Sequence, residues 1–351
     1  MRDALRDLQS AAQRSLDPVI WHYISRGSGD HRSAAEAETS WDGWQLRPRV
    51  LRDVSEISTS RQLFGSWQTP VGIAPTAFHR LMHPEGEAAT ARGAAASGAP
   101  FVLSSRSTVP IEEVAREFGG NPWWFQVYLM HDRSISDALM LRAAAAGATA
   151  LVLTGDTPYV GYRPRAGQVR PLPLGEDLSL IGVRQHLPVD VADPWPLIDQ
   201  TPRQTMADIE RLADLSGLPV IVKGVLRGDD AVACVRAGAD AIWVSNHGGR
   251  QLDGAIAPSH ALGEVVEAVG DRVPVVVDGG VRGGRDALVA LALGASAVFV
   301  GRPALWALAD GGAGGVAELL TGLRAELAHL MGLAGATDLT QLDRSLVTRI
   351  D

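Results

Sequence analysis

The chain has 351 residues, of which 46% are hydrophobic and 21% charged, and these values are typical of a folded globular protein rather than a disordered one. Its net charge of −8 at pH 7 repels a phosphate backbone, and no basic run interleaved with aromatic residues offsets that charge, so we expect no nucleic-acid partner. The N-terminus lacks a signal-peptide apolar segment and no later run approaches membrane-spanning length, so we expect no membrane insertion and a cytoplasmic location.

The first 68 residues predict short helices and a hairpin-like segment, which we expect to form an N-terminal extension. From Thr69 onward, eight short β-branched runs alternate with alanine-rich segments of helical period. In chain order the runs are "PVGIAPT", "PFVLSS", "WWFQVY", "ALVLTGD", "PVIVKG", "AIWVSN", "PVVVDGG" and "AVFVGR". Several helical segments end on a glycine just before the next run, as a helix C-cap would.

This alternation predicts an α/β fold, and eight strands between residues 69 and 310 match a (β/α)8 TIM barrel. A doubly wound open sheet is the alternative, but the GxGxxG turn expected after its first strand is absent. Residues 311–351 contain C-terminal helices, and we expect them to pack with residues 1–68 around one domain that spans 1–351. The proline- and glycine-rich segment from about 157 to 202 follows the fourth strand and is predicted to be a lid loop.

Polar side chains collect where the predicted strands end. They are Thr76, Ser104, Ser105, Gln126, Tyr128, Thr154, Asp156, Lys223, Ser245, His247, Arg250, Asp278, Gly301 and Arg302. In a barrel, the C-terminal strand ends surround one cavity, so residues that are far apart in sequence become neighbours. A single polar strand end has a structural explanation, but so many at one rim predict a functional site.

The loops after the last two strands, "DGGVRGGRDAL" and "GRPALW", place glycines and arginines where barrels commonly bind a phosphate. Tight turns are the alternative interpretation of these glycines. Lys223 is the only lysine of the chain, and it ends an apolar run, where a lysine is seldom buried without a partner. Together with a phosphate at these loops and with Ser104, Gln126 and Thr154, it predicts a planar cofactor across the barrel mouth. Lys223 fits a flavin, because a cation near N1 and O2 stabilises the reduced ring. A strand-end cation that reaches solvent is the alternative for this lysine.

The stretch "VSNHGGRQLDG" follows the sixth strand and places His247 and Arg250 three residues apart. An arginine binds a carboxylate with two hydrogen bonds, while a neutral histidine accepts a proton from the group to be oxidised. Asp156, after the fourth strand, is the candidate partner that orients the imidazole. Other residues receive structural interpretations: His79, His83 and His260, and the single cysteine Cys234, which predicts a buried helix position and no metal site.

At these residues the chain resembles the FMN-dependent L-2-hydroxy acid oxidase and dehydrogenase family, which includes glycolate, lactate and mandelate oxidases. The segments that carry the resemblance are "PTAFHRLMHPEGE", "FQVY", "TGDTP", "VKGV", "SNHGGRQLDG" and "DGGVRGGRDALVALALGASAVFVGRP". It runs from about Leu16 to the last helix and implies FMN as the cofactor, a small 2-hydroxy acid as the substrate and a homotetramer.

The resemblance also implies roles for individual residues. His247 would be the catalytic base with Asp156 as its partner, and Tyr23, Tyr128, Arg163 and Arg250 would bind the substrate. Cofactor contacts would come from Pro75, Thr76, Ala77, Ser104, Gln126, Thr154, Lys223 and Ser245, and the phosphate would lie at Asp278, Gly280, Arg282, Gly301 and Arg302.

The chain departs from the family near the substrate. It reads "SSRS" where glycolate oxidases resemble "SSW", so Arg106 places a cation near the pocket for the substrate side chain unless it turns to solvent. Tyr162 stands where the family commonly has another arginine, and the lid after Arg165 is shorter than usual. A second anionic or polar group on the substrate is therefore plausible.

Three functions remain open from the sequence. The first is oxidation of an L-2-hydroxy acid to the 2-oxo acid, with electrons passed from FMN to oxygen or another acceptor. The alternative is a flavin-dependent tailoring enzyme or isomerase that acts on a larger or carrier-bound substrate, which Arg106 and the altered lid favour. A non-catalytic binding barrel is the third.

Overall fold

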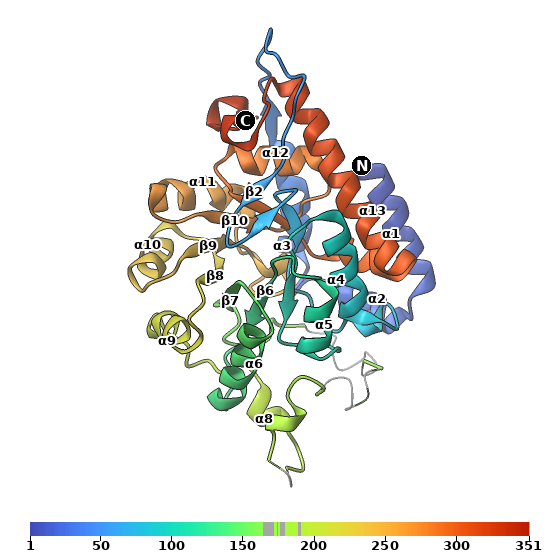
Figure 1. Cartoon of the computed structure of the whole chain (residues 1–351), viewed down its shortest axis with the longest axis vertical. Helices are drawn as coiled ribbons and strands as arrows, with labels where there is room; N and C mark the ends of the chain where they lie inside the picture. Colours follow the sequence, from blue (N-terminus) through green and yellow to red (C-terminus); the bar gives the residue numbers. More distant parts are fainter. Residues whose placement is uncertain (164–171, 174, 176–179, 189–190, 351) are drawn as a thin grey trace.

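The computed structural model describes residues 1–163, 172–173, 175, 180–188 and 191–350. Eight parallel strands lie side by side in the order β4-β11-β10-β9-β8-β7-β6-β5. Their bounds are β4 (Val71–Ile73), β5 (Val102–Ser104), β6 (Trp124–Val127), β7 (Ala150–Thr154), β8 (Val220–Val225), β9 (Ala241–Val244), β10 (Val275–Asp278) and β11 (Ala297–Val300). A parallel bridge between Ile73 and Phe101 joins β4 to the chain entering β5, so the sheet closes on itself. The predicted (β/α)8 barrel is confirmed, and the open sheet is excluded (Figure 1).

A helix follows each strand and covers the outside of the barrel. These helices are α4 (Gly86–Ser97), α5 (Ile111–Glu117), α6 (Arg133–Ala145), α9 (Ala207–Ser216), α10 (Gly228–Arg236), α11 (Pro258–Val269), α12 (Gly284–Ala292) and α13 (Arg302–Ala334). Gly98 ends α4 in the left-handed conformation, as the predicted glycine C-cap requires. The predicted boundary at residue 310 falls inside α13, just before Gly312, where φ 56° and ψ −138° kink the helix.

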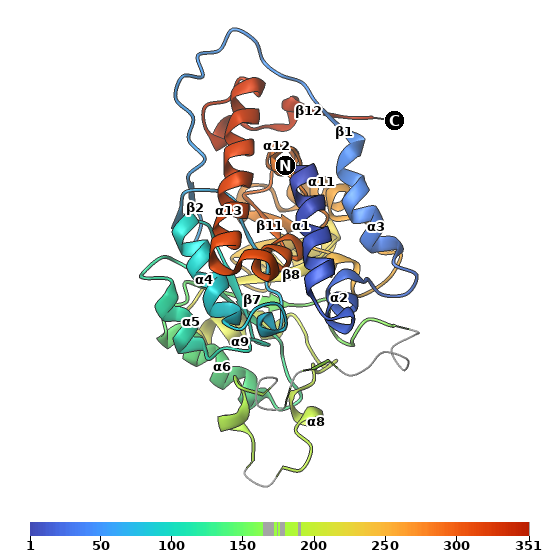
Figure 2. The same ribbon diagram turned by 90° about the vertical axis from the view of Figure 1, so that its right-hand side faces the viewer.

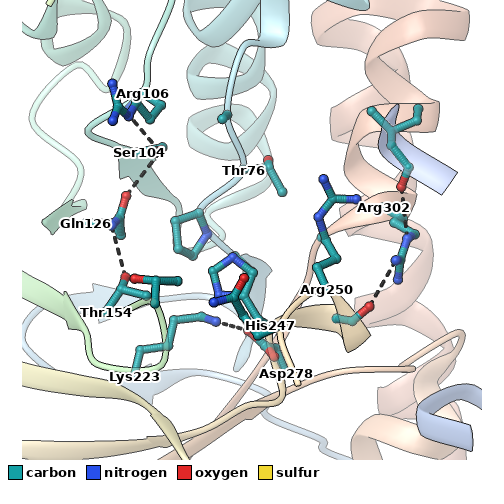
Figure 3. A pocket seen from close by; sticks show the side chains of 18 of the residues that line it. Thr76, Ser104, Arg106, Gln126, Thr154, Lys223, His247, Arg250, Asp278 and Arg302 are labelled. Atoms are coloured by element: carbon teal, nitrogen blue, oxygen red, sulfur yellow. Dashed lines mark hydrogen bonds and ion pairs between the residues drawn. The ribbon is translucent and has the colours of Figure 1, made fainter. Parts of the chain in front are cut away.

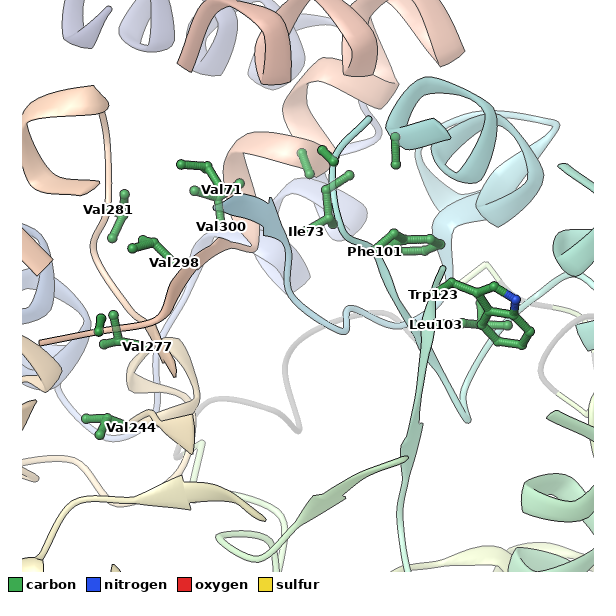
Figure 4. Close-up of a cluster of buried hydrophobic side chains, with 14 of the residues drawn as sticks. Val71, Ile73, Phe101, Leu103, Trp123, Val244, Val277, Val281, Val298 and Val300 are labelled. Atoms are coloured by element: carbon green, nitrogen blue, oxygen red, sulfur yellow. The ribbon is translucent and has the colours of Figure 1, made fainter. Parts of the chain in front are cut away.

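Side chains alternate between the barrel interior and the helix layer, because successive residues of a strand point to opposite faces. In β7, Leu151 and Leu153 belong to the outer cluster, whereas Ala150 and Val152 point inward. Figure 4 shows the outer cluster, in which strand valines and Ile73 pack under the helices. The same alternation sends Ser104, Gln126, Thr154, Lys223 and Asp278 into the interior at the C-terminal end of the barrel.

Aromatic rings fill the interior of the barrel toward the N-terminal ends of its strands. Trp243 and Phe299 lie 4.3 Å apart between ring centroids, and Trp124 packs against both. The hairpin of β2 (Arg61–Gln62) and β3 (Ser66–Trp67) adds Trp67, whose ring lies 5.1 Å from that of Trp124. This packing fills the N-terminal end of the barrel, and the described residues leave room for a ligand at the C-terminal end.

The N-terminal extension forms α1 (Arg2–Ser15), α2 (Pro18–Ser25) and α3 (Arg32–Thr39). Helix α1 lies against α13 (Figures 1 and 2), and β1 (Trp44–Leu46) pairs antiparallel with β12 (Val347–Arg349) near the C-terminus. The extension also reaches the loops that follow the barrel strands. The backbone N–H of Ser28 donates to the carbonyl of Gly249 over 2.9 Å, and the indole N–H of Trp41 donates to that of Gly279 over 2.8 Å.

The segment predicted as a lid lies partly outside the described residues. Its described part contains a short 3₁₀ helix (Arg184–His186) and α8 (Trp195–Ile198). Cys234 is buried in α10, as predicted. Within the described ranges, no helix is both long enough and apolar enough to cross a membrane.

Candidate active site

A cavity of about 350 Å³ lies at the C-terminal end of the barrel. Among the residues that line it are the following predicted ones: Tyr23, Pro75, Thr76, Ala77, Ser104, Arg106, Gln126, Tyr128, Thr154, Arg163, Lys223, His247, Arg250, Asp278, Gly280, Arg282, Gly301 and Arg302. Three other predicted residues are absent from the lining but hydrogen-bonded to it: Asp156 to His247, Ser245 to Lys223 and Ser105 to Gln126. The cavity is also lined by Trp195 and Asp199, which the sequence did not single out.

Three strands hold a chain of hydrogen-bonding groups on one side of the cavity (Figure 3). The Ser104 hydroxyl donates to Oε1 of Gln126 over 3.1 Å, and Nε2 of Gln126 donates to Oγ1 of Thr154 over 2.9 Å. Both serine and glutamine come from paired positions of β5 and β6, so the strand register sets their spacing. All three side chains are buried, which fixes their orientation before any ligand arrives.

Lys223 is a buried cation with two partners. Its Nζ donates to Oγ of Ser245 over 2.7 Å and lies 3.0 Å from Oδ2 of Asp278. The Ser245 hydroxyl donates in turn to Oδ1 of Asp278 over 2.6 Å. The lysine is 4% exposed, so the alternative of a cation reaching solvent is wrong. The sequence grouped Asp278 with the phosphate contacts, but its carboxylate faces this lysine, and a carboxylate repels a phosphate.

His247 lies after β9 in a strained backbone conformation. Its φ of 57° is left-handed, which is uncommon for a residue other than glycine. The backbone N–H donates to Oγ of Ser245 over 3.0 Å, and the ring Nδ1 lies 3.1 Å from Oδ1 of Asp156. These contacts direct the ring's other nitrogen, Nε2, away from Asp156.

The charge state of Asp156 supports this pairing. Burial alone raises the pKa of a carboxyl group, but the charge and hydrogen bond of His247 and the charge of Lys223 outweigh it, so the pKa of Asp156 lies below its ordinary value. The carboxylate is therefore ionised at neutral pH. An ionised acceptor at Nδ1 selects the tautomer that carries its proton there and leaves Nε2 free to accept one.

Two arginines and a tyrosine surround the space beside His247. Arg250 donates Nη1 to the carbonyls of Tyr23 and Arg26 over 2.8 and 2.9 Å, which positions its guanidinium and leaves Nη2 for a ligand. Nε of Arg163 is buried without a partner among the described residues, and burial, followed by the charge of Arg250, lowers the pKa of Arg163. Burial, followed by the charge of Asp156, raises the pKa of Tyr128, so its hydroxyl stays protonated and can donate.

The other end of the cavity is built to hold an anion. Arg302 donates to the carbonyls of Ile24 and Gly248, and burial, with the charges of Arg250 and Arg282, lowers the pKa of Arg302 to about 9. Its guanidinium group therefore lies among like charges in a buried place. An anion at this end would relieve that repulsion.

The backbone at this end fits the same ligand. Gly280 has φ 76°, and a Cβ atom there would lie 1.8 Å from the carbonyl oxygen of Ala37, so only glycine fits. Helices α12 and α13 both begin here, and helix N-termini favour a phosphate. The guanidinium group of Arg282 lines the cavity at this end and adds a second positive charge. These donors fit the phosphate of FMN, and the polar chain with Lys223 fits the edge of its ring.

Comparisons with known proteins agree with this geometry. The chain matches the model of one protein family, described as FMN-dependent dehydrogenase, over residues 12–349. An L-lactate oxidase from Nostoc sp. is 43% identical over 354 residues, which cover 98% of this chain and 97% of the relative. A 4-hydroxymandelate oxidase from Amycolatopsis orientalis is 42% identical over 340 residues, which cover 95% of this chain and 94% of the relative. The crystal structure of a mandelate oxidase has a TM-score of 0.89 and 39% identity, with 99% of this chain and 98% of that one covered.

A barrel with an anion site after its last two strands and a buried lysine beside a His–Asp pair defines a flavin-dependent oxidoreductase. The chain belongs to the FMN-dependent dehydrogenase family. The predictions of this family, of FMN as the cofactor and of an oxidoreductase that acts on the CH–OH group of a 2-hydroxy acid are confirmed.

Proposed function

We propose that His247 is the base in the oxidation of an L-2-hydroxy acid to the 2-oxo acid. The observation that carries this proposal is the 3.1 Å contact between its Nδ1 and Asp156, which leaves Nε2 as a proton acceptor beside unoccupied donors of two arginines. Bound FMN supplies the two-electron acceptor in this cavity. The roles of the individual residues below are part of the same proposal.

Arg163 and Arg250 bind the substrate carboxylate. Both guanidinium groups line the cavity together with His247. They carry like charges and repel each other when no anion lies between them. A carboxylate between them gains charge-assisted hydrogen bonds and removes that repulsion. The hydroxyl groups of Tyr23 and Tyr128 donate to the same substrate oxygens. Binding at four points then holds the C2 carbon in one orientation relative to His247.

In the chemical step, the C2–H and O–H bonds of the substrate break and the C2–O bond becomes a carbonyl. One proton passes to Nε2 of His247, and the second hydrogen would leave with the two electrons to the bound cofactor, so both hydrogens lost by the substrate are accounted for. Asp156 acts through His247, because its negative charge stabilises the imidazolium that forms. Hydride transfer and carbanion formation both use this base.

The cofactor contacts divide into two groups. We assign the ring to Pro75, Thr76, Ala77, Ser104, Gln126, Thr154, Lys223 and Ser245, and the phosphate to Gly280, Arg282, Gly301 and Arg302. Asp278 contributes by holding Lys223 in place. Because Asp278 partly compensates the charge of Lys223, the lysine favours negative charge on the ring less strongly than an unpaired cation would.

Anaerobic mixing of the yellow protein with free 2-hydroxy acids tests the proposal. Glycolate, lactate, mandelate and longer or dicarboxylic acids form the panel, and loss of flavin absorbance reports reduction. The proposal requires at least one L-acid to bleach the flavin, while its D-enantiomer does not. If none does, the alternative of a larger or carrier-bound substrate replaces it. Admission of air afterwards shows whether oxygen is the acceptor.

The homotetramer, the cytoplasmic location and the single domain of residues 1–351 also stay proposals. Light scattering of the purified protein tests the first, and fractionation of cells that make it tests the second. Calorimetric unfolding tests the third, because a single domain unfolds in one cooperative transition.

A further inference from the structure

Arg106 departs from the family pattern, and its charged side chain lines the described cavity. It follows β5, and its backbone N–H donates to Oγ of Ser104 over 3.1 Å. The side chain lines the same cavity as His247 and is only 8% exposed, so it does not turn to solvent. Figure 3 shows it on the side of Ser104 and Gln126, across the pocket from Arg250.

The contacts of Arg106 leave its charge without a counter-ion. Nη2 donates to the carbonyl of Ile198 over 2.6 Å, and the guanidinium lies 5.9 Å from the ring centroid of Trp195. Nη1 is buried and has no hydrogen-bond partner among the described residues. No carboxylate of the described ranges forms an ion pair with it, and burial lowers the pKa of Arg106 despite the more distant charge of Asp199. A buried cation without an ion pair destabilises the fold, unless a ligand supplies the missing negative charge.

The charges of the cavity point to the missing partner. Asp156 faces His247 and Asp278 faces Lys223, so neither carboxylate is available to Arg106. Asp199 also lines the cavity and attracts Arg106, but it forms no ion pair with it among the described residues. One substrate carboxylate between Arg163 and Arg250 leaves Arg106 still unmatched. A second negative group, on the part of the substrate that extends away from C2, would match it.

We propose that Arg106 binds a second carboxylate at the end of the substrate side chain, so that the enzyme prefers dicarboxylic 2-hydroxy acids to monocarboxylic ones. This inference rests on the proposed function, because it assumes that Arg163 and Arg250 hold the first carboxylate. The guanidinium group, which lines the cavity, donates to the new carboxylate, and the bond from Nη2 to Ile198 holds it in position. A charge-assisted hydrogen bond in so buried a place favours an anion over a neutral chain of the same length.

A structural role is the competing explanation. Arg106 could simply hold α8 over the cavity through Ile198 and Trp195. That role predicts that replacing the arginine weakens all substrates alike. A role in recognition predicts a loss confined to substrates with the second carboxylate.

The experiment compares matched pairs of substrates in matched variants. The L-forms of malate and 2-hydroxyglutarate are paired with 2-hydroxybutanoate and 2-hydroxypentanoate, which lack the second carboxylate. Wild type, Arg106→Gln and Arg106→Lys are measured, with Arg236→Gln as the control because Arg236 is exposed on α10 and does not line the cavity. We expect Arg106→Gln to lower kcat/KM for the better diacid by about 30-fold or more. We expect kcat/KM for its partner to stay within about threefold, and Arg106→Lys to recover part of the loss.

A second measurement needs no variant and no turnover. The 2-oxo diacid and the matching 2-oxo monoacid are titrated into the oxidised wild-type protein, and Kd follows from the change in flavin absorbance. Tighter binding of the diacid supports the inference, and equal or weaker binding overturns it, even if Arg106→Gln fails to fold. Equal losses for both substrates of a pair overturn it as well, while reduction of the flavin by the monoacids leaves the proposed function intact. If no 2-hydroxy acid reduces the flavin, the proposed function fails instead.

Discussion

Nδ1 of His247 lies 3.1 Å from Oδ1 of Asp156, although β9 positions the first residue and β7 the second. Each residue lies a few positions after the end of its strand, so the two neighbouring regions of the barrel rim bring them together. The contact joins positions 91 residues apart. Because the pKa of Asp156 is lowered, this contact places a full negative charge behind the imidazole at neutral pH.

Replacing Asp156 with Asn should slow the reduction of the flavin by substrate. We expect the rate to fall by about 10²-fold or more, because a neutral amide stabilises the imidazolium less than a carboxylate does and no longer selects the tautomer with its proton on Nδ1. Asp156→Glu, which keeps the negative charge, should recover part of the loss. Flavin absorbance checks that both variants retain the cofactor, and a near-normal rate of reduction in Asp156→Asn contradicts our account.

The carboxylate of Asp156 should also make the free energy of unfolding depend on pH in the acidic range. Its folded pKa is below its ordinary value of 3.8, so it stabilises the protein above that pH, and the contribution disappears as pH falls through the folded value. Chemical denaturation of wild type and Asp156→Asn measures this. The difference in the free energy of unfolding should shrink as pH falls below about 4. A difference that grows with acid would show that the carboxylate is not stabilised in the folded state.

Arg302 predicts that an anion stabilises the protein without its cofactor. A base whose folded pKa is lowered to about 9 from 12.5 destabilises the fold while it is protonated, and that cost is present at pH 7. Inorganic phosphate at 100 times its Kd should add about 2.7 kcal/mol to the free energy of unfolding. Arg302→Met should abolish most of this gain. Thermal unfolding of the FMN-free protein with phosphate, and with chloride at equal ionic strength, provides the measurement.

Gly280 should tolerate no side chain. In Gly280→Ala, the new Cβ would meet the carbonyl oxygen of Ala37 at 1.8 Å and would impose a strained φ of 76°, so we expect weaker FMN binding and a lower Tm. Gly263→Ala is the matched control, because Gly263 lies in α11 with open space around its Cα and alanine favours a helix by about 1 kcal/mol. Equal effects of the two changes would mean that the turn at Gly280 does not require glycine.

Much of the barrel is predictable because each strand is short and largely apolar, and polar residues lie in or just after its last positions. The alternation of inward and outward side chains then explains why Gln126, Thr154 and Lys223 share one cavity. The pairing of β1 with β12 is not predictable in this way. It joins two three-residue strands from opposite ends of the chain, and each strand is too short to show an alternation of apolar and polar residues that would predict it.

The details of the site depend on contacts that no local pattern encodes. The pairing of Lys223 with Asp278 requires the register of three neighbouring strands, whereas the resemblance to the family grouped Asp278 with the phosphate contacts. The environment of Arg106 depends on Ile198 and Trp195, which lie in a segment without periodicity. Its presence is visible in the sequence as "SSRS", but its burial and missing partner are visible only in the fold.

The most direct test of the central claim is anaerobic stopped-flow reduction of His247→Asn by the best 2-hydroxy acid. Our account predicts that the variant keeps FMN and that the rate of flavin reduction falls by about 10² to 10⁴-fold, because no group accepts the proton. His260→Asn, which replaces a histidine outside the cavity, should reduce at the wild-type rate. Reduction of His247→Asn at a near-normal rate would contradict the assignment of His247 as the base.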